Sequence, residues 1–528
     1  MKINHRVPLL RHEDKDEKEV LIAHRASKGS EGKDEKEVLI AHRASKGSEG
    51  KDEKEVLIAH RASKGSEGKD EKKVLIAPNI FRAYDIRGIY PKELDEKAAY
   101  LIGRAFVKFL NKKNLRIAVG RDGRLSSPSL FKFLTKGITC QGANVIDIGL
   151  STTPMLYFAV AHFKFDGGIN ITASHLPSEY NGFKLVREKA IPISEKTGLK
   201  EIKKLTTGYP QSGCGSVITR PGSVVKMRVL KEYIEFNLKG FNLKKIKPLK
   251  IVIDTANAVP GIVVSGIFKK TNCKIYHLYS KLDGSFPNHP PIPHEEENLK
   301  GLEKEVLKKK ADLGIAFDGD GDRIIFVDEN GEMIPGDLIT ALLARLILEE
   351  NPGEKVLCDV RSSNVVRDVV KENGGRVVIG RIGHSFIKER MRKGNIIFQG
   401  ELNGHYYSRK HYFCEAPFFV ILKILEEMSE SGKNISELVK PFQRYFHSGE
   451  INFKVKDKKK VLETLEEKFR EGKVLKIDGL RIDFPDWWFN ARPSHTEPVL
   501  RLVVEAKNRK IMEQKKKEIS SLILKIFK

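Results

Sequence analysis

The sequence predicts an α/β fold, with three consecutive domains built on mixed or parallel sheets and a smaller C-terminal α+β domain. Two observations support this prediction. From residue 79 onward, short apolar runs typical of buried strands alternate with segments that carry apolar residues at helical spacing. The chain has 528 residues, of which 40% are apolar, so it is long enough for three or four domains with cores of their own.

The first domain is predicted at 78–222. Residues 93–110 place apolar side chains at helical spacing behind Asp95, a suitable N-cap, and Pro128 stands where a second helix should begin. Strands are predicted at 117–119, 145–148 and 168–172. This alternation of strand and helix predicts a mostly parallel sheet that is covered by helices on both faces.

Two further α/β domains are predicted at 223–335 and 336–446, and the α+β domain at 447–528. Strands of the two α/β domains are expected at 250–254, 313–317, 356–359, 377–379 and 396–398. The last domain should contain a helix near 459–471, short strands around Trp487 and at 500–505, and a closing helix. Linkers that contain Pro or Gly separate the domains near residues 221, 335 and 449.

A perfect tandem repeat precedes these domains. The string KDEKEVLIAHRASKGSEG fills residues 15–32 and recurs identically at 33–50 and 51–68. Each 18-residue copy has one four-residue apolar run, which buries too little surface to offset chain entropy. A solenoid of short strands and turns is the alternative. We expect the repeat segment, 1–77, to be disordered, and we assign no chemistry to it.

The charge balance favours anionic partners. Lys and Arg outnumber Asp and Glu by 95 to 70, a net charge of +25, which suits nucleic acid or small phosphorylated ligands. Aromatic residues do not alternate with basic ones along a strand, so no nucleic-acid partner is expected. The sequence contains no apolar run of about 18 residues, so no membrane partner is expected. The charged N-terminus also lacks the pattern of a secretory signal peptide. A cytoplasmic protein is the expectation.

Two motifs carry reactive groups. Ser174 and His175 follow the predicted strand at 168–172, where α/β sheets place ligands, and Lys184 is expected to return to the same loop. No G-x-S-x-G pattern surrounds Ser174, so a Ser-His hydrolase has little support, and a polar turn is the alternative.

The second motif has three carboxylates at alternate positions, Asp318, Asp320 and Asp322, which suit Mg²⁺ or Ca²⁺ rather than zinc. An EF-hand loop would need glycine at its sixth position, where this sequence has Arg323, and it would need flanking helices. The flanking segments here indicate strands instead. The motif therefore predicts a compact Mg²⁺ site, with an acidic turn as the alternative.

Two further loops offer polar groups suited to a phosphosugar. Glu401, Asn403 and His405 follow a predicted strand and can bond to sugar hydroxyls, although a polar loop is equally compatible with this stretch. The second loop combines an arginine fork, hydroxyls and turn amides into a phosphate cradle. Its residues are Arg492, Ser494, His495, Thr496 and Arg501.

Together these four motifs, with Phe81–Gly88, Gly120–Pro128 and Asp283–Pro287, resemble the α-D-phosphohexomutase family, and within it the phosphomannomutase/phosphoglucomutase group. The resemblance covers about 450 residues, from Phe81 to the C-terminus. It implies four domains around a central cleft and a phosphosugar substrate. It also implies one Mg²⁺ per site, hexose 1,6-bisphosphate as activator, and a monomer or homodimer.

The resemblance also implies roles for individual residues. Ser174 would be the phosphoserine and would hold Mg²⁺ together with Asp318, Asp320 and Asp322. The catalytic groups would be Ser174, His175, Lys184, Arg87 and Arg323. The substrate-binding groups would be Tyr84, Arg361, His384, Glu401, Asn403, His405, Arg492, Ser494, His495, Thr496 and Arg501.

Four positions depart from the family pattern, and one of them is Ala258, which replaces the glycine of an Asn-Gly turn. Leu176 and His495 stand where the family usually has Asn, and Asn403 stands where it has Ser. The expected function is the interconversion of hexose 1-phosphate and hexose 6-phosphate, with mannose, glucose or both as the sugar. It would proceed through phosphoserine and a hexose 1,6-bisphosphate. The alternatives are a Mg²⁺-dependent sugar-phosphate phosphatase and the glucosamine-phosphate mutase branch.

Overall fold

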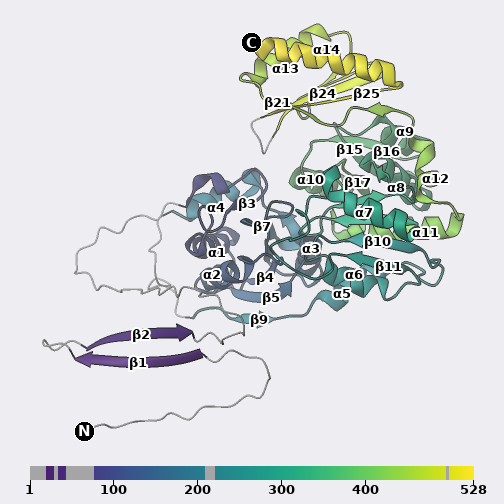
Figure 1. Ribbon diagram of the computed structural model, residues 1–528. Coiled ribbons are helices and arrows are strands. Elements are labelled where there is room, and N and C mark those ends of the chain that lie inside the picture. Colours follow the sequence, from purple (N-terminus) through teal and green to yellow (C-terminus); the bar gives the residue numbers. More distant parts are fainter. Residues whose placement is uncertain (1–19, 29–33, 43–75, 208–219, 495–498, 528) are drawn as a thin grey trace, which may run out of the picture. The chain divides into compact units, whose positions relative to one another are not determined.

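The computed structural model describes residues 20–28, 34–42, 76–207, 220–494 and 499–527 (Figure 1). The chain divides into two units, Met1–Asp70 and Glu71–Lys528. In the first unit, β1 (Val20–Lys28) and β2 (Asp34–His42) pair antiparallel, with Val20 opposite His42. These strands belong to the first two copies of the repeat. The rest of the predicted disordered segment, up to residue 75, lies outside the described residues.

The first domain of the second unit is built on a seven-stranded mixed sheet of order β3-β7-β6-β4-β5-β9, with β8 paired to β7. Its strands are β3 (Ile86–Ile89), β4 (Arg116–Arg121), β5 (Asn144–Leu150), β6 (Gly167–Ile171), β7 (Tyr180–Arg187), β8 (Ile191–Pro192) and β9 (Val224–Lys226). Its helices are α1 (Glu96–Leu110), α2 (Ser127–Thr139), α3 (Thr153–His162) and α4 (Leu199–Leu205).

Local sequence explains the start of α1, whereas the far edge of the sheet depends on tertiary pairing. The carboxylate of Asp95 accepts a hydrogen bond from the Ala98 amide at 2.8 Å, so the predicted N-cap is confirmed. At the other edge, β9 lies beyond residue 222 and yet joins the first sheet, with Val224 beside Val145. All three residues of β9 are exposed, so backbone pairing holds this strand, not an apolar face.

The second and third domains share one five-stranded topology. Their sheets have the orders β11-β10-β12-β13-β14 and β16-β15-β17-β18-β19. The strands are β10 (Lys250–Asp254), β11 (Lys274–Leu278), β12 (Leu313–Phe317), β13 (Ile324–Val327), β14 (Met333–Ile334), β15 (Lys355–Asp359), β16 (Arg376–Gly380), β17 (Phe398–Gly400), β18 (Tyr406–Ser408) and β19 (Cys414–Glu415). The helices are α5 (Leu230–Leu238), α6 (Gly261–Phe268), α7 (Glu296–Lys309), α8 (Gly336–Glu350), α9 (Asn364–Glu372), α10 (His384–Gly394), α11 (Pro417–Ser431) and α12 (Ile435–Val439).

The shared topology determines where the chemistry-bearing loops lie. The first domain shares one feature with the second and third. In each of these three domains, one strand pairs parallel with its inner neighbour, and a turn then leads to a strand that pairs antiparallel with it. These equivalent turns connect β6 to β7, β12 to β13, and β17 to β18. They contain Ser174, the Asp318–Asp322 stretch and the Glu401–His405 stretch. The same turn of the topology therefore carries different polar residues in each of the three domains.

The fourth domain has an antiparallel sheet of order β20-β25-β24-β23-β22, with β21 also paired to β25. Its elements are β20 (Phe446–His447), β21 (Ile451–Phe453), α13 (Lys458–Lys468), β22 (Lys473–Leu475), β23 (Leu480–Asp483), β24 (Trp487–Pro493), β25 (Leu500–Ala506) and α14 (Arg509–Phe527). Buried Arg481 lies 3.5 Å from the Trp488 ring centroid and donates to the Val360 carbonyl, which connects this domain to the third.

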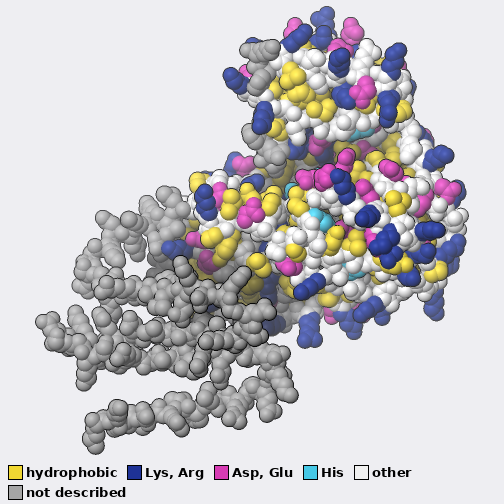
Figure 2. Space-filling model, viewed as in Figure 1, with side chains coloured by type: hydrophobic (Ala, Val, Ile, Leu, Met, Phe, Trp, Pro, Cys, Tyr) yellow, Lys and Arg dark blue, Asp and Glu magenta, His cyan; other side chains and the backbone are white. Residues whose placement is uncertain are grey.

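The surface composition and the apolarity of the helices each give one observation. On the face shown in Figure 2, Lys and Arg side chains are interspersed with acidic and apolar ones. Within the described part of the chain, no helix combines the length and apolarity that crossing a membrane would require.

Candidate active site

The serine loop is held in an unusual backbone conformation. Ser174 is buried and has a φ of 54°, in the left-handed region that costs energy for a residue with a Cβ. Its amide donates to Thr172 Oγ1 at 2.9 Å. Fully buried Arg124 donates to four carbonyl oxygens of this loop at 2.5–3.0 Å, those of Ser174, Leu176, Pro177 and Tyr180. One guanidinium therefore fixes the path of the loop that carries Ser174.

The structure brings Ser174 against the acidic loop of the second domain. Ser174 Oγ donates to Asp318 Oδ2 at 2.8 Å. The two loops also approach through their backbones, because a Cβ added to Gly319 would lie 2.4 Å from the Ser174 carbonyl oxygen. Only glycine fits at position 319, which explains one of the glycines between the carboxylates.

The three carboxylates converge, and one ammonium group offsets part of their charge. Carboxylate oxygens of Asp318, Asp320 and Asp322 lie within 4.8 Å of one another, and all three residues are buried. Lys184 Nζ donates to Asp320 Oδ2 at 2.7 Å and also to Asp322 Oδ2. Burial alone would lower the pKa of Lys184, but Asp320 and Asp322 reverse this effect and raise it.

This acidic cluster can hold a metal ion. Burial, together with Asp322 and Asp320, raises the pKa of Asp318 well above its usual range. Burial acts on Asp322 in the same direction, but Lys184 and Arg323 outweigh it and lower the pKa of Asp322. Asp320 Oδ1 and Asp322 Oδ1 are buried without a hydrogen-bond partner among the described residues. Orphaned carboxylate oxygens at this spacing match the ligands of a hard divalent cation.

The metal loop is attached to the first domain at a second point. The Thr153 amide donates to the Asp320 carbonyl at 2.9 Å, and Thr153 Oγ1 donates to the Asp320 carboxylate. Asn170 Nδ2 in turn donates to Thr153 Oγ1 at 3.0 Å. The cluster thus depends on contacts from both the first and the second sheet.

Two further predicted residues flank Ser174. His175 Nδ1 lies 3.4 Å from Ser174 Oγ, and burial followed by Arg323 lowers the pKa of His175 well below its usual range. Arg87 pairs with Asp85 at 2.8 Å and contacts the Ala173 carbonyl at 3.3 Å. His175 is therefore neutral and Arg87 is charged beside the serine.

The sugar loop is braced by an arginine. Arg361 Nη2 donates to Glu401 Oε1 at 3.1 Å, and the Tyr407 hydroxyl donates to Glu401 Oε2 at 2.7 Å. Burial raises the pKa of Glu401 to about 7, although Arg361 opposes this shift. Asn403 Oδ1 is buried without a hydrogen-bond partner among the described residues. The loop therefore presents the Asn403 Oδ1 atom as a buried hydrogen-bond acceptor that is available to a ligand.

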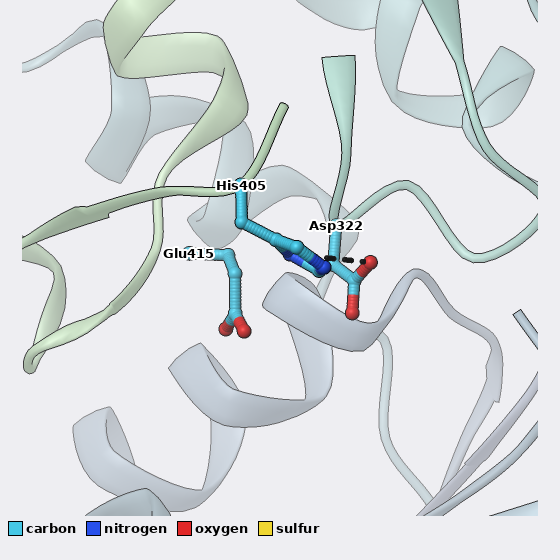
Figure 3. A group of neighbouring side chains, drawn as sticks. All are labelled: Asp322, His405 and Glu415. Carbon is cyan, nitrogen blue, oxygen red and sulfur yellow. Dashed lines mark ion pairs between the residues drawn. The ribbon is translucent and has the colours of Figure 1, made fainter. Parts of the chain in front are cut away.

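His405 links the sugar loop to the metal loop (Figure 3). Arg323 Nε donates to His405 Nε2 at 2.9 Å, so the second ring nitrogen, Nδ1, carries the hydrogen of the neutral ring. Nδ1 lies 3.7 Å from Asp322 Oδ1, and Glu415 lies in the same group. Lys388 pairs with Glu415 at 2.8 Å, so an ammonium group already lies beside this carboxylate.

Tyr84 and His384 meet at the start of α10. Their ring centroids are 5.4 Å apart in an edge-on arrangement. Burial, and then Lys388, lowers the pKa of His384 well below its usual range. Both side chains thus form an aromatic, uncharged wall beside the charged loops.

The predicted phosphate cradle is an arginine cluster that spans the third and fourth domains. Arg492 Nη2 donates to Glu450 Oε1 at 2.7 Å, while Arg361 Nη1 lies 3.6 Å from Glu450 Oε1 and Arg501 Nη1 lies 3.7 Å from Glu450 Oε2. The amide of Ser494 donates to the Val499 carbonyl at 2.9 Å. His495 and Thr496 lie outside the described residues.

Sequence reasoning missed several members of the site. Glu450 and the buried Lys388–Glu415 pair belong to no motif, and each depends on partners from distant segments. His294 was also missed, and its ring centroid lies 6.0 Å from that of His175. Burial and then Arg323 lower the pKa of His294 to about 4. The one available signal was the position of Glu450 directly after Gly449, at a predicted domain linker.

Arg124 gives a testable prediction about the serine loop. Arg124→Ala leaves four carbonyls without their donor, so we expect a loss of about 2–4 kcal/mol in the free energy of unfolding and a reduced kcat. Thermal or urea unfolding, together with turnover, measures both effects. Lys136→Ala, an exposed change on α2, is the control. Unfolding equal to wild type in Arg124→Ala would contradict the role of the guanidinium.

The comparisons with known proteins cover most of the second unit. The chain matches four phosphoglucomutase/phosphomannomutase domain families: alpha/beta/alpha domain I at residues 78–212, domain II at 231–331, domain III at 335–445 and the C-terminal domain at 450–522. These matches together take in most of the chain, and their order follows the four sheets.

Individual relatives agree with these matches. A phosphomannomutase from Methanocaldococcus jannaschii is 39% identical over 450 residues, which cover 85% of this chain and 98% of that protein. One from Vibrio cholerae is 40% identical over 459 residues, covering 84% and 98%. The crystal structure of a phosphoglucomutase/phosphomannomutase family protein from Burkholderia thailandensis superposes with a TM-score of 0.76 at 31% identity, covering 85% and 97%. The chain therefore belongs to the phosphoglucomutase/phosphomannomutase family and is an isomerase of that family.

Proposed function

We propose that this protein interconverts hexose 1-phosphate and hexose 6-phosphate, with mannose, glucose or both as the sugar, through a phosphorylated Ser174. The observation that carries the proposal is the 2.8 Å contact between Ser174 Oγ and Asp318 Oδ2, within a buried cluster of three carboxylates. A hydroxyl beside a potential metal site is the arrangement that phosphoryl transfer requires, since positioning and charge neutralisation supply most of the catalysis.

The proposed reaction has two half-steps. First, the P–O bond to Ser174 breaks while a new P–O bond forms to the free sugar hydroxyl, which gives a hexose 1,6-bisphosphate. The proton of that hydroxyl ends on Ser174 Oγ, and Lys184 is the group proposed to carry it. The intermediate then turns around, and its other phosphoryl group returns to Ser174 by the reverse exchange. Arg87 and Arg323 provide positive charge beside the transferring group.

Asp318, Asp320, Asp322 and phosphorylated Ser174 are proposed to hold Mg²⁺. When bound, the ion would neutralise charge on the transferring phosphoryl oxygens. The two orphaned oxygens, Asp320 Oδ1 and Asp322 Oδ1, support this assignment. Lys184 offsets part of the same negative charge through its contact with Asp320.

The remaining predicted residues are proposed to select and hold the substrate. Glu401, Asn403 and the Nδ1–H of His405 would bond to sugar hydroxyls, and Tyr84 and His384 would line the wall beside them. Arg361, Arg492, Arg501, Ser494, His495 and Thr496 would hold the phosphate that does not react. Binding energy from that remote phosphate would align the reacting atoms.

A coupled assay tests the proposal. We expect the purified protein to convert mannose 1-phosphate or glucose 1-phosphate into the 6-phosphate, with activity that requires Mg²⁺ and is stimulated by the 1,6-bisphosphate. A sugar-phosphate phosphatase would instead release inorganic phosphate without the activator. Equal or better turnover of glucosamine 1-phosphate would move the protein to the glucosamine-phosphate branch and contradict the proposed substrate.

A further inference from the structure

A carboxylate of this chain occupies the centre of the proposed phosphate cradle. Glu450 lies between β20 and β21, directly after Gly449, whose φ is 70°. Its carboxylate is within 2.7–3.7 Å of guanidinium nitrogens from Arg361, Arg492 and Arg501. The carboxylate therefore accepts a hydrogen bond from Arg492 and forms longer ion pairs with Arg361 and Arg501, the cations proposed to hold the substrate phosphate.

Burial and mutual repulsion of the arginine side chains favour an anion within the cluster. Arg361 and Arg492 are nearly fully buried, with side chains 3% exposed. Burial and then Arg361 lower the pKa of Arg492, because the two cations repel each other. Burial would raise the pKa of Glu450, but Arg361, Arg492 and Arg501 lower it to about 2, so this carboxylate is ionised at any working pH.

Glu450 is also placed so that it can leave. Its side chain is 27% exposed, whereas those of Arg361 and Arg492 are 3% exposed. A phosphate monoester carries a charge of about −1.5 to −2 and three acceptor oxygens, against one charge and two oxygens for the carboxylate. A bound phosphate would therefore neutralise more of the positive charge of the cluster than the carboxylate does.

We infer that Glu450 is an internal anion that fills the arginine cluster in the free protein and competes with the substrate phosphate for it. The inference rests on the proposed function, since it identifies the cluster as the site of the non-reacting phosphate. Glu450 is then a positioning residue that sets phosphate affinity. By reclaiming the arginines, it also helps to release a phosphate when the bisphosphate intermediate must turn around.

The test is binding of inorganic phosphate to the full chain, measured by calorimetry in the presence of a metal chelator. The proteins compared are wild type, Glu450→Gln and Glu471→Gln, a control that removes an exposed carboxylate from the same domain. We expect the phosphate dissociation constant of Glu450→Gln to fall about threefold to tenfold, the scale of a partly exposed ion pair, and that of Glu471→Gln to stay unchanged. Unchanged or weaker binding in Glu450→Gln overturns the inference.

Steady-state kinetics separate competition from simple structural support. Competition predicts a lower KM and a lower kcat for Glu450→Gln, because phosphate binds more tightly and leaves more slowly. A carboxylate that only braces the arginines predicts a higher KM. If Glu450→Gln does not fold, Glu450→Asp serves, with a shortened reach and an expected intermediate gain in phosphate affinity. Mutase activity retained without Ser174 would defeat the proposed function and leave the phosphate-binding result standing.

Discussion

Ser174→Ala is expected to reduce mutase turnover by roughly four to six orders of magnitude. The proposed reaction passes both phosphoryl groups through this one oxygen, so no other hydroxyl of the site can replace it. The substitution removes the hydrogen bond to Asp318 but leaves the loop anchored by Arg124. Stability should therefore change little, and substrate binding should persist. The coupled assay and the thermal midpoint measure these quantities.

The control for this variant is Ser178→Ala, which removes an exposed hydroxyl from the same loop. Its turnover should equal that of wild type. The mass of the intact protein gives an independent readout, because wild type treated with the 1,6-bisphosphate should gain one phosphoryl group and Ser174→Ala should gain none. Full mutase activity in Ser174→Ala would show that Ser174 is not the phosphoryl carrier.

Asp320→Asn is expected to lower turnover by about two to four orders of magnitude and to weaken Mg²⁺ binding. The amide keeps the shape of the side chain and its contact with Thr153, but it removes one of three negative charges that face the metal position. Because Lys184 bridges Asp320 and Asp322, the change also removes the charge of one of the two carboxylates that pair with that ammonium group.

Thermal shift and turnover measured across a Mg²⁺ titration test this expectation. Wild type should be stabilised as the concentration of Mg²⁺ rises, since a ligand that binds only the folded state raises the melting temperature. Asp320→Asn should show little stabilisation at the same concentrations. Glu332→Gln, which neutralises an exposed carboxylate in the same domain, should behave as wild type. A wild-type response to Mg²⁺ in Asp320→Asn would remove Asp320 from the proposed ligand set.

Strands with a buried apolar run between charged residues were predicted to the residue. Examples are β10 (Lys250–Asp254) and β12 (Leu313–Phe317), where every residue but the first of β10 is buried. In contrast, β9 was not predicted, because its three exposed residues carry no periodic signal and it pairs with a segment about 80 residues away. The strand predicted at 396–398 begins two residues later, at Phe398, because pairing with β18 sets its bounds.

The site shows the same division between local and long-range information. The reactive residue types could be recognised because they lie close together in short motifs, as in Asp318–Asp322. The function of Arg124 could not, because its four acceptors lie about 50 residues further along the chain. The role of Glu450 could not be predicted for the same reason. Its partners Arg361 and Arg492 lie about 90 and 40 residues away in the sequence.

The contacts of Thr153 and Ser174 with the metal loop have a consequence for the life of the chain at the ribosome. The serine loop is synthesised 144 residues before Asp318. At about 5–20 residues per second, this interval lasts roughly 7–30 s. During that time Ser174 lacks its hydrogen-bond partner Asp318. The contacts between the serine loop and the acidic loop therefore form only after the second domain has been synthesised.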